Sequence, residues 1–338
     1  MKDKINIAVI GAGRVGWYHA EHLAHRIEEA RLLAITDVRK DAAEKCASAL
    51  GVSKVFQDHR NAFDDPEVQA VVICSTSDTH ALLVAEAAAA GKHIFCEKPL
   101  ALDLKQIDDV LEKVTTAGVK LQVGFHRRFN KKFRRIWELV QEGKVGEPHL
   151  LRIASRDAAP PRIEYVKVSG GIFLDMMSHD FDMARYLVND EVEELYAVGG
   201  VRIDPEIGKA GDVDTAVVTL KFTDGCFGTI DNSRQAVYGY DQRVEVFGSK
   251  GMVSTEKNTP NSPRLRKSET VQEDRPSSHF MESTVNAYLD EMNAFIKCIK
   301  EDKDPPVTGR DGRKAVAMGM AARLSYEQNR PVPLSEIS

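Results

Sequence analysis

Two residues that could do chemistry, Asp175 and His179, lie four positions apart in an otherwise apolar segment, GGIFLDMMSHDFDMARYL (170–187). If this segment is a helix, both side chains project from one face, next to an apolar stripe that includes Met183 and Leu187. A carboxylate and an imidazole on one face can pair within a core, bind a metal ion, or orient and deprotonate a substrate. The spacing alone leaves these three alternatives open.

Lys98 is another residue that could take part in chemistry. It lies in Cys96-Glu97-Lys98-Pro99-Leu100, at the end of the apolar run 93–97. If that run is a buried strand, Lys98 lies at the edge where open α/β sheets bind ligands. Pro99 restricts the turn and permits a cis peptide bond. We therefore expect Lys98 to face a ligand cleft, as a cation that could stabilise negative charge on a substrate oxygen.

A nucleotide signal comes near the start of the chain, where Gly11-Ala12-Gly13-Arg14-Val15-Gly16 follows the apolar run 5–10 and opens a helical pattern. In this motif the first two glycines allow a tight turn and close approach to a pyrophosphate, and the third lets the helix pack on the strand. The helix N-terminus then faces the anion. Because the strand and helix context is present, the motif predicts dinucleotide binding.

Asp37 indicates which dinucleotide binds. It ends the next apolar run, 31–36, 21 residues after Gly16, where a carboxylate accepts hydrogen bonds from a ribose 2′-hydroxyl. A 2′-phosphate at the same place would be repelled, so NAD is favoured over NADP. Arg39 offers partial compensation for such a phosphate and leaves dual use as a minority alternative.

These residues need a scaffold, and the first half of the chain predicts one in which β-rich apolar runs alternate with amphipathic helical patterns. The runs are 5–10, 31–36, 69–75, 93–97 and 120–125. Strands that are apolar throughout and separated by helices indicate a parallel sheet covered on both faces. We predict a doubly wound Rossmann domain over residues 1–125.

The second half, residues 126–338, changes character. Runs at 149–156, 213–222, 226–235 and 243–254 alternate in polarity, with turn residues between them. This pattern predicts an α+β domain with a large, mostly antiparallel open sheet. Helical patterns at about 130–142, 175–188, 283–300 and 310–328 would cover one face, and the last helix could pack back on the first domain. We expect a surface loop from Lys257 to Ser278.

Composition bounds the class of protein. The chain of 338 residues is longer than one hydrophobic core ordinarily organises. Of its residues, 43% are hydrophobic and 29% are charged, as in water-soluble globular proteins. A net charge of -5 gives no reason to bind nucleic acid, and we read the basic run 126–135 as a solvated helix face, with Arg127 as the exception because it follows a strand end. No apolar run is long enough for a membrane span and no signal peptide is evident, so we expect a cytoplasmic protein.

The five cysteines contain no C-x-x-C pair, so we expect reduced core residues and no structural zinc site.

The chain resembles the Gfo/Idh/MocA family of sugar and cyclitol oxidoreductases along essentially its whole length. The carrying motifs are GAGRVG at 11–16, EKP at 97–99 and the D-x-x-x-H of Asp175 and His179, with further likeness to the inositol-oxidising members at 124–129, 145–157, 170–188 and 238–248. The resemblance implies NAD-dependent oxidation of myo-inositol at its 2-hydroxyl, in a homotetramer. It implies that Lys98, Asp175 and His179 are catalytic, with His179 as base.

The resemblance adds Ser75, Thr76 and His80 to the cofactor-binding residues that the glycine motif and Asp37 already indicate. The expected cofactor-binding residues are Gly11, Ala12, Gly13, Arg14, Val15, Asp37, Ser75, Thr76, His80, Glu97 and Lys98. The expected substrate-binding residues are Arg127, Asp157 and Tyr240. No metal is expected.

Three alternatives stay open at this stage. A metal enzyme is disfavoured, since Asp175 and His179 are too few ligands and no H-E-x-x-H or cysteine cluster completes a shell. A non-catalytic NAD-binding regulator would not need Lys98 together with this pair. A substrate that is another inositol isomer or a pyranose sugar fits the same residues.

Overall fold

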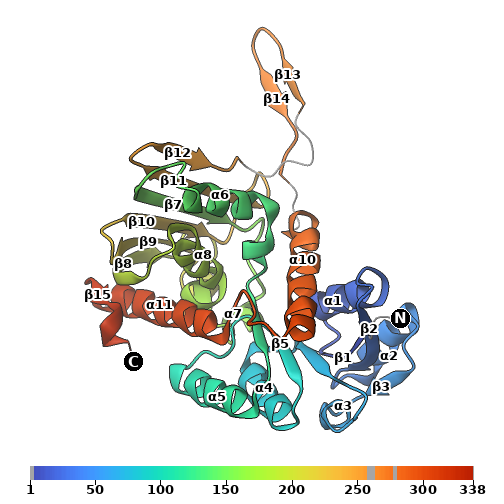
Figure 1. Cartoon of the computed structure of the whole chain (residues 1–338). Coiled ribbons are helices and arrows are strands. Elements are labelled where there is room, and N and C mark those ends of the chain that lie inside the picture. The colour runs from blue at the N-terminus through green and yellow to red at the C-terminus, as the bar shows by residue number, and fades with distance from the viewer. Residues whose placement is uncertain (1–3, 257–262, 277–279, 338) are drawn as a thin grey trace. The chain divides into compact units, whose positions relative to one another are not determined.

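The structure, a computed structural model, describes residues 4–256, 263–276 and 280–337. It divides into two units, one formed by residues 1–129 and 285–316 and the other by residues 130–284 and 317–338. The division thus falls at Phe129 instead of at 125, and a C-terminal segment counts with the first unit. Figure 1 shows the elements of both units.

The first unit contains a six-stranded parallel sheet in the order β3-β2-β1-β4-β5-β6. Its strands are β1 (Ile5–Ile10), β2 (Ala30–Thr36), β3 (Lys54–Phe56), β4 (Ala70–Ile73), β5 (His93–Glu97) and β6 (Leu121–Gly124). Its helices are α1 (Arg14–His25), α2 (Lys40–Leu50), α3 (Arg60–Phe63), α4 (His80–Ala89) and α5 (Leu104–Ala117), joined by much of α10 (Phe280–Glu301). This is the doubly wound Rossmann order, in which the chain reverses direction across the sheet between β1 and β4. The prediction of a parallel sheet is confirmed, and the short β3 was missed.

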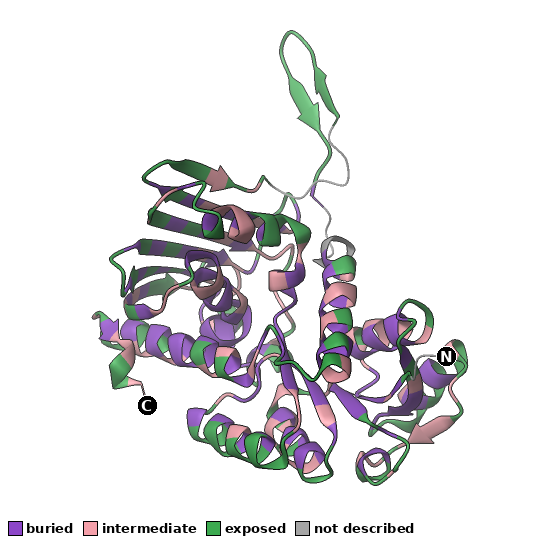
Figure 2. Ribbon diagram, in the orientation of Figure 1, coloured by how far each residue is buried: buried purple, intermediate pink, exposed green. Residues whose placement is uncertain are grey.

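Burial explains why these residues form this sheet. All four residues of β4 are buried, as are four of the five in β5, as expected for strands covered on both faces. Figure 2 shows buried residues along the strands and exposed ones on the outer side of α5. Met292, Phe295 and Ile296 of α10 join the core built around β1, so α10 belongs to the packing of this unit.

The second unit contains a seven-stranded mixed sheet in the order β12-β11-β7-β10-β9-β8-β15. Its strands are β7 (Pro148–Arg156), β8 (Val192–Gly200), β9 (Thr215–Phe222), β10 (Phe227–Ser233), β11 (Asp241–Gly248), β12 (Gly251–Ser254) and β15 (Val332–Pro333). Its helices are α6 (Lys131–Gln141), α7 (Ile163–Val166), α8 (Ser178–Val188) and α9 (Pro205–Lys209), with most of α11 (Gly309–Gln328). Neighbouring strands are antiparallel except for β7 and β10, which run parallel. The predicted mostly antiparallel sheet is confirmed, although β8 was missed.

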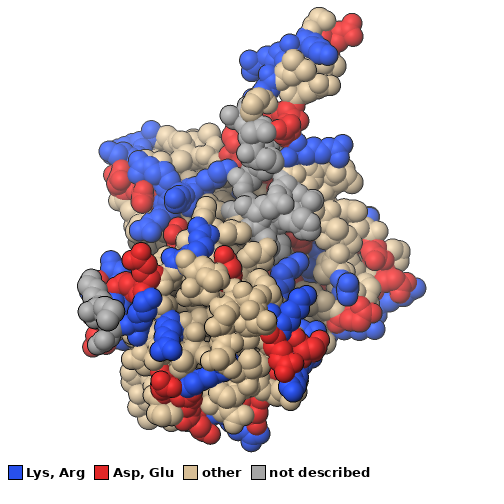
Figure 3. All heavy atoms as spheres, turned by 90° about the vertical axis from the view of Figure 1, so that its right-hand side faces the viewer, with Lys and Arg blue, Asp and Glu red and all other residues tan. Residues whose placement is uncertain are grey.

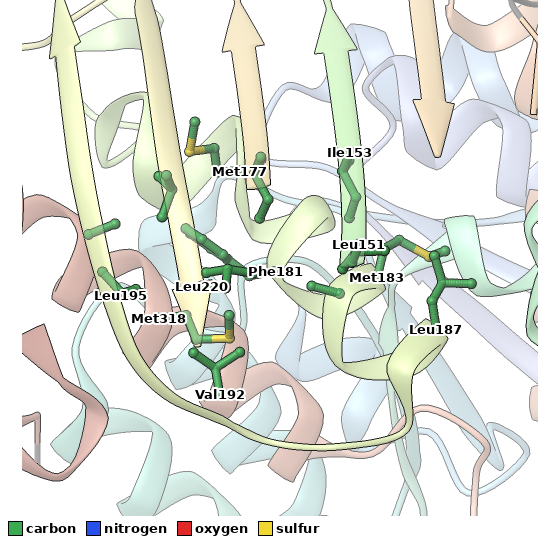
Figure 4. Packing of buried hydrophobic residues seen from close by; sticks show 14 of the residues in the cluster. Leu151, Ile153, Met177, Phe181, Met183, Leu187, Val192, Leu195, Leu220 and Met318 are labelled. Atoms are coloured by element: carbon green, nitrogen blue, oxygen red, sulfur yellow. The ribbon is translucent and has the colours of Figure 1, made fainter. Parts of the chain in front are cut away.

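Helix α8 packs one face of this sheet. Figure 4 shows Phe181 pointing toward Leu220 of β9, and Met183 lying beside Leu151 of β7. Phe181 is fully buried and Met183 is 1% exposed. The apolar stripe of this segment is therefore the core contact, and the polar groups that interrupt it must serve another purpose.

Two predictions of local structure were wrong. The segment that carries Asp175 is a π-helical turn, Ile172–Met176, and the α-helix begins only at Ser178. Asp175 and His179 therefore lie in helical turns of different type, and the expected α-helical spacing does not apply between them. In the expected loop Lys257–Ser278, β13 (Arg264–Arg266) pairs with β14 (Val271–Glu273), while residues 257–262 and 277–278 lie outside the described part of the chain. Alternation over three residues is too short a signal for a strand.

Three bulk expectations can be compared with the structure. All five cysteines are free, and Cys74 alone among them is not fully buried. None of the described helices combines the length and apolarity that a membrane crossing requires. On the face drawn in Figure 3, acidic and basic side chains are interspersed.

Candidate functional site

The glycine loop between β1 and α1 is shaped by close backbone contacts. Gly11 has φ +100°, and a Cβ there would lie 2.7 Å from the carbonyl of Cys74. A Cβ on Gly16 would lie 1.8 Å from the carbonyl oxygen of Gly11. Both positions therefore require glycine, for a strained turn and for close packing of the helix on the strand.

Gly13 is different, because a Cβ built there meets no protein atom within 4 Å. Its φ of -69° is also one that any residue adopts. Gly13 caps α1 with no side-chain hydrogen bond, and no acidic residue stands in the first turn. The open space and the uncapped amide groups fit a pyrophosphate at this helix N-terminus. Arg14 and Val15 follow in the same turn, exposed and half-buried respectively.

Asp37, directly after β2, is held in place by two backbone amides. Its Oδ2 accepts a hydrogen bond from the nitrogen of Ala12 at 2.8 Å, and its Oδ1 accepts one from the nitrogen of Arg39 at 2.9 Å. The Arg39 side chain is largely exposed, with Nε 3.6 Å from Oδ1. Asp37 itself is 9% exposed. The carboxylate is thus fixed beside the glycine loop, with acceptor capacity left on both oxygens.

The residues expected after β4 form a small hydrogen-bonded turn. Oγ of Ser75 lies 2.6 Å from Oγ1 of Thr79, whereas Thr76 is exposed. His80 is buried, with Nδ1 2.8 Å from the carbonyl oxygen of Pro99 and Nε2 3.2 Å from that of Ser75. His80 therefore ties this turn to the loop after β5, which indicates a supporting role for its ring.

The loop after β5 carries Lys98 and contains a cis bond between Lys98 and Pro99, in agreement with the sequence. Lys98 is half-buried, and Glu97 is 9% exposed. Oε1 of Glu97 lies 2.9 Å from Nε2 of the fully buried His19 on α1. Glu97 thus points into the unit and holds the loop to α1, in keeping with its expected support of the cofactor or the turn.

A second carboxyl group lies behind Glu97. Oε1 of Glu291, on α10, is 4.0 Å from Nε2 of His19, and Glu291 is fully buried. Neither carboxyl oxygen of Glu291 has a hydrogen-bond partner among the described residues. Burial, and then the neighbouring charge of Glu97, raise the pKa of Glu291 well above its usual value. These three side chains could hold a metal ion by their spacing, but a neutral, protonated Glu291 accounts for the same arrangement.

Arg127 lies in the first unit, in a 3-10 turn that follows β6. It is 6% exposed, unlike the solvated residues expected for most of this basic run. The adjacent His126 is buried and stacks on Tyr288 of α10, with ring centroids 4.6 Å apart. Burial, followed by the charges of Arg127 and Lys98, lowers the pKa of His126 well below its usual value. Arg127 and Lys98 therefore belong to one electrostatic neighbourhood.

In the second unit, Asp175 is 7% exposed, and its carboxylate lies among polar side chains that include Tyr165 and Arg234. The hydroxyl of Tyr165 donates a hydrogen bond to its Oδ1 at 2.8 Å. Nη1 of Arg234 lies 3.6 Å from its Oδ2. Desolvation, and then the charge of Asp175, raise the pKa of Tyr165. Asp175 is thus a carboxylate within a buried polar cluster.

The backbone that carries Asp175 is fixed by the carboxylate of Asp212. Both oxygens of Asp212 accept from the nitrogen of Ile172, at 3.0 and 3.1 Å, at the start of the π-helical turn. Gly171 has φ +77°, and a Cβ there would lie 2.5 Å from Oδ1 of Asp212. At the other end, Oγ of Ser178 donates to the carbonyl oxygen of Asp175 at 2.8 Å.

Asp180 is another charged residue in this apolar segment, and its contacts explain why it is there. It is fully buried and accepts hydrogen bonds from Oγ of Ser155 at 2.7 Å and from Nδ2 of Asn232 at 2.9 Å. These partners lie on β7 and β10. Asp180 therefore anchors α8 to the sheet, a structural role that the sequence analysis did not identify.

The other predicted residues of the second unit lie on different elements. Asp157 follows β7, and its nitrogen donates to the carbonyl oxygen of Ser233 at 3.0 Å. Its charge is a smaller cause of the raised pKa of Tyr165, after burial and Asp175. His179 begins α8 and is half-buried. Tyr240 lines a small cavity next to α6, together with residues such as Lys132 and Gln242.

Sequence reasoning missed Tyr165, Asp212 and Arg234. Arg234 ends a predicted strand, so the rule that singled out Arg127 could have found it. Tyr165 and Asp212 lie in irregular segments, where no periodic pattern marks them.

Models of known protein families match a region of each unit. The oxidoreductase family with an NAD-binding Rossmann fold matches residues 5–125, and the GFO/IDH/MocA C-terminal domain matches residues 133–254. The chain is 49% identical to the myo-inositol 2-dehydrogenase of Thermotoga maritima, over 98% of this chain and 99% of that protein. It is 40% identical to the inositol 2-dehydrogenase of Rhizobium meliloti, over 98% and 99% of the two chains.

A solved structure shows the same fold. The scyllo-inositol dehydrogenase of Lactobacillus casei with bound NAD(H) and scyllo-inositol superposes with a TM-score of 0.92 at 32% identity, over 98% of this chain and 100% of that one. The matched regions include the glycine loop, the loop of Lys98 and the Asp175 cluster. The chain is therefore a member of the Gfo/Idh/MocA family of NAD-dependent oxidoreductases.

Proposed function

We propose that this enzyme oxidises myo-inositol at its 2-hydroxyl to 2-keto-myo-inositol and reduces NAD to NADH. The observation that carries the proposal is the full-length identity of 49% with a myo-inositol 2-dehydrogenase. It is supported by the polar cluster around Asp175, which offers several buried hydrogen-bonding groups to a polyol. A substrate with a hydroxyl on every ring carbon needs such groups for its orientation.

The proposed chemistry divides between three side chains. A bound NAD would supply the acceptor for the hydride that leaves the ring carbon. His179 takes the proton from the hydroxyl on that carbon, as general base. The Lys98 ammonium stabilises the negative charge that develops on the oxygen, so that the carbonyl forms as the proton and hydride depart. Asp175 orients the substrate and balances the positive charge.

Other residues would bind the remainder of the ligands. We assign Arg127, Asp157 and Tyr240 to further hydroxyl groups of the substrate. We assign the two oxygens of Asp37 to the adenosine ribose of NAD, because the amides of Ala12 and Arg39 already fix their direction. The glycine loop and the N-terminus of α1 would receive the pyrophosphate.

A panel of purified polyols tests this proposal. The protein is mixed with NAD and each of myo-inositol, scyllo-inositol, chiro-inositol and glucose, and NADH is followed by its absorbance. We expect the highest kcat/KM with myo-inositol. The 32% identical relative that binds scyllo-inositol makes that isomer the second candidate. Turnover of glucose without any turnover of inositols would contradict the assignment, and no turnover at all would favour a non-catalytic regulator.

We also propose that the protein is a homotetramer that uses the open face of the second sheet. Leu150, Phe227 and Phe247 lie side by side on three neighbouring strands, because Leu150 pairs with both phenylalanines. Phe227 is 54% exposed and Phe247 43%. A contiguous apolar surface of this kind is typical of an interface between protein chains.

Light scattering tests the assembly. At micromolar concentration we expect a mass well above the 37.5 kDa of one chain, and Phe227→Lys with Phe247→Lys should reduce it. A scattering mass of one chain for the wild-type protein would contradict the proposed assembly. It would not bear on the proposed activity.

A further inference from the structure

Arg234 is a fully buried arginine at the carboxyl end of β10. Its exposed fraction is 2%, and its backbone nitrogen donates to the carbonyl oxygen of Asp214 at 2.9 Å. Its Nε and Nη2 have no hydrogen-bond partner among the described residues. Removing a guanidinium from water costs several kcal/mol unless charged partners compensate. This position therefore needs an explanation beyond filling the core.

The two carboxylates that compensate Arg234 are those that shape the candidate site. Nη1 lies 3.6 Å from Oδ2 of Asp175, and Nη2 lies 3.6 Å from Oδ2 of Asp212. Both distances exceed that of a hydrogen bond, so the contacts are electrostatic. In a buried setting such attraction is strong, because little solvent screens it.

Each carboxylate has a second fixed contact. Asp175 accepts a hydrogen bond from the hydroxyl of Tyr165. Asp212 accepts one from the backbone nitrogen of Ile172, the residue that begins the π-helical turn. Arg234 thus joins the side chain of Asp175 to the group that holds the backbone turn on which Asp175 stands. One cation controls both the charge and the direction of that carboxylate.

We propose that Arg234 is a positioning residue that keeps Asp175 ionised and aimed at the substrate, with Tyr165 and Asp212 as its partners. The inference deepens the proposed function, on which it rests. Arg234 itself is not assigned to the substrate, because its guanidinium is buried behind the two carboxylates.

The charged surroundings of Asp175 come from several elements. Tyr165 faces it from α7, Arg234 from the end of β10, and Asp157 acts on the same cluster from the end of β7. His179 begins the next helix. Asp212 reaches Arg234 from the segment before β9. Among these groups Arg234 is the permanent cation, so its removal would leave the carboxylates facing one another.

The experiment compares Arg234→Gln, Arg234→Lys and the control Arg185→Gln. Arg185 belongs to the same unit and pairs with Glu191, at 2.7 Å. An opposite charge at this range lowers a carboxylate pKa by about 1–3 units. In Arg234→Gln we therefore expect kcat/KM for myo-inositol to fall about 10- to 100-fold, and the acidic limb of its pH profile to move to higher pH, because loss of the positive charge favours the protonated forms of both Asp175 and the base His179.

Conservative replacement separates positioning from a merely structural role. Arg234→Lys keeps the charge, so its pH limb should stay near that of the wild type while kcat/KM is partly recovered. Arg185→Gln should change neither quantity. If Arg234→Gln has the wild-type pH limb and kcat/KM within about threefold, the proposal is overturned.

A measurement without turnover distinguishes this inference from the proposed function. Carbon-13 labelled aspartate, with the Asp175 resonance identified by Asp175→Asn, reports the titration midpoint of that carboxyl group directly. A midpoint that rises in Arg234→Gln supports the positioning role even if no inositol is oxidised. If that variant does not fold, Asp212→Asn provides the comparison, because it removes the carboxylate that competes for Arg234 and should therefore lower the Asp175 midpoint. An Asp175 midpoint that is unchanged in Arg234→Gln, or in Asp212→Asn where Arg234→Gln does not fold, overturns the inference.

Discussion

The carboxylate of Asp37 accepts a hydrogen bond of 2.8 Å from the backbone nitrogen of Ala12, in the glycine loop. This contact joins the residue expected to select the cofactor to the loop expected to bind its pyrophosphate. The two parts of the nucleotide site therefore keep a fixed relation before any ligand binds. A change at Asp37 should affect both.

Asp37→Ser should lower kcat/KM for NAD and raise it for NADP. A hydrogen bond to a charged group contributes about 1.5–3 kcal/mol, so the wild type should prefer NAD by at least about tenfold. The serine removes the repulsion of a 2′-phosphate and also leaves the Ala12 amide without its acceptor. Steady-state kinetics with both cofactors measures the ratio, with Asp41→Ser as a control on an exposed carboxylate of α2. An unchanged ratio would show that Asp37 does not contact the ribose.

Alanine substitutions at two glycines of the same loop should affect different properties, stability for Gly16 and NAD affinity for Gly13. Gly16→Ala places a Cβ 1.8 Å from the carbonyl oxygen of Gly11, so we expect a loss of stability of about 1–3 kcal/mol or more. Gly13→Ala meets no protein atom within 4 Å, so the fold should be retained. NAD affinity should nevertheless fall at least about tenfold, because the methyl group occupies the space of the pyrophosphate. Thermal unfolding and calorimetric titration with NAD measure both effects, and tight NAD binding by Gly13→Ala would contradict the placement.

Lys98→Ala and His179→Ala should each lower kcat by about 10²–10⁴, with NAD affinity largely retained. If both residues serve one proton-transfer step, their effects are not additive. The double variant should then lose little more activity than the worse single variant. Kinetics of the four proteins form a double-mutant cycle. A double loss equal to the product of the single factors would show that the residues act independently.

The glycine loop and Asp37 could be located from the sequence more readily than the cluster around Asp175. The glycine loop and Asp37 are close in sequence and stand at fixed offsets from strands, so periodicity locates them. The cluster around Asp175 is assembled from α7, a π-helical turn and the end of β10. Its members are far apart in sequence, and a π-helical turn has no period that a pattern search detects. The strand-end rule could have singled out Arg234, but its contact with Asp175 becomes visible only in the folded structure.

Asp180→Ala should destabilise the second unit. The aspartate is fully buried and accepts from Ser155 and Asn232, so the variant loses two hydrogen bonds to a charged group and leaves two buried donors unsatisfied. We expect a loss of about 3 kcal/mol or more in the free energy of unfolding, against about 1 kcal/mol for Ser155→Ala. Denaturant titration measures both. Equal stability of Asp180→Ala and wild type would show that the anchor contributes nothing.

The buried Glu291 should make stability depend on pH in a defined direction. Burial and the charge of Glu97 raise its pKa in the folded state well above 4.5, so the folded protein retains a proton that the unfolded chain releases. Its stabilising contribution is therefore complete below about pH 4.5 and is lost as the pH rises toward the higher folded value. Glu291→Gln keeps the shape and cannot ionise, so its stability relative to the wild type should increase as the pH is raised from 4.5 to 8. Denaturant titrations at several pH values measure this difference, with Glu112→Gln on the exposed side of α5 as the control. A difference that stays constant across that range would mean that Glu291 is charged in the folded protein, held by His19 or by a bound cation at the cluster with Glu97.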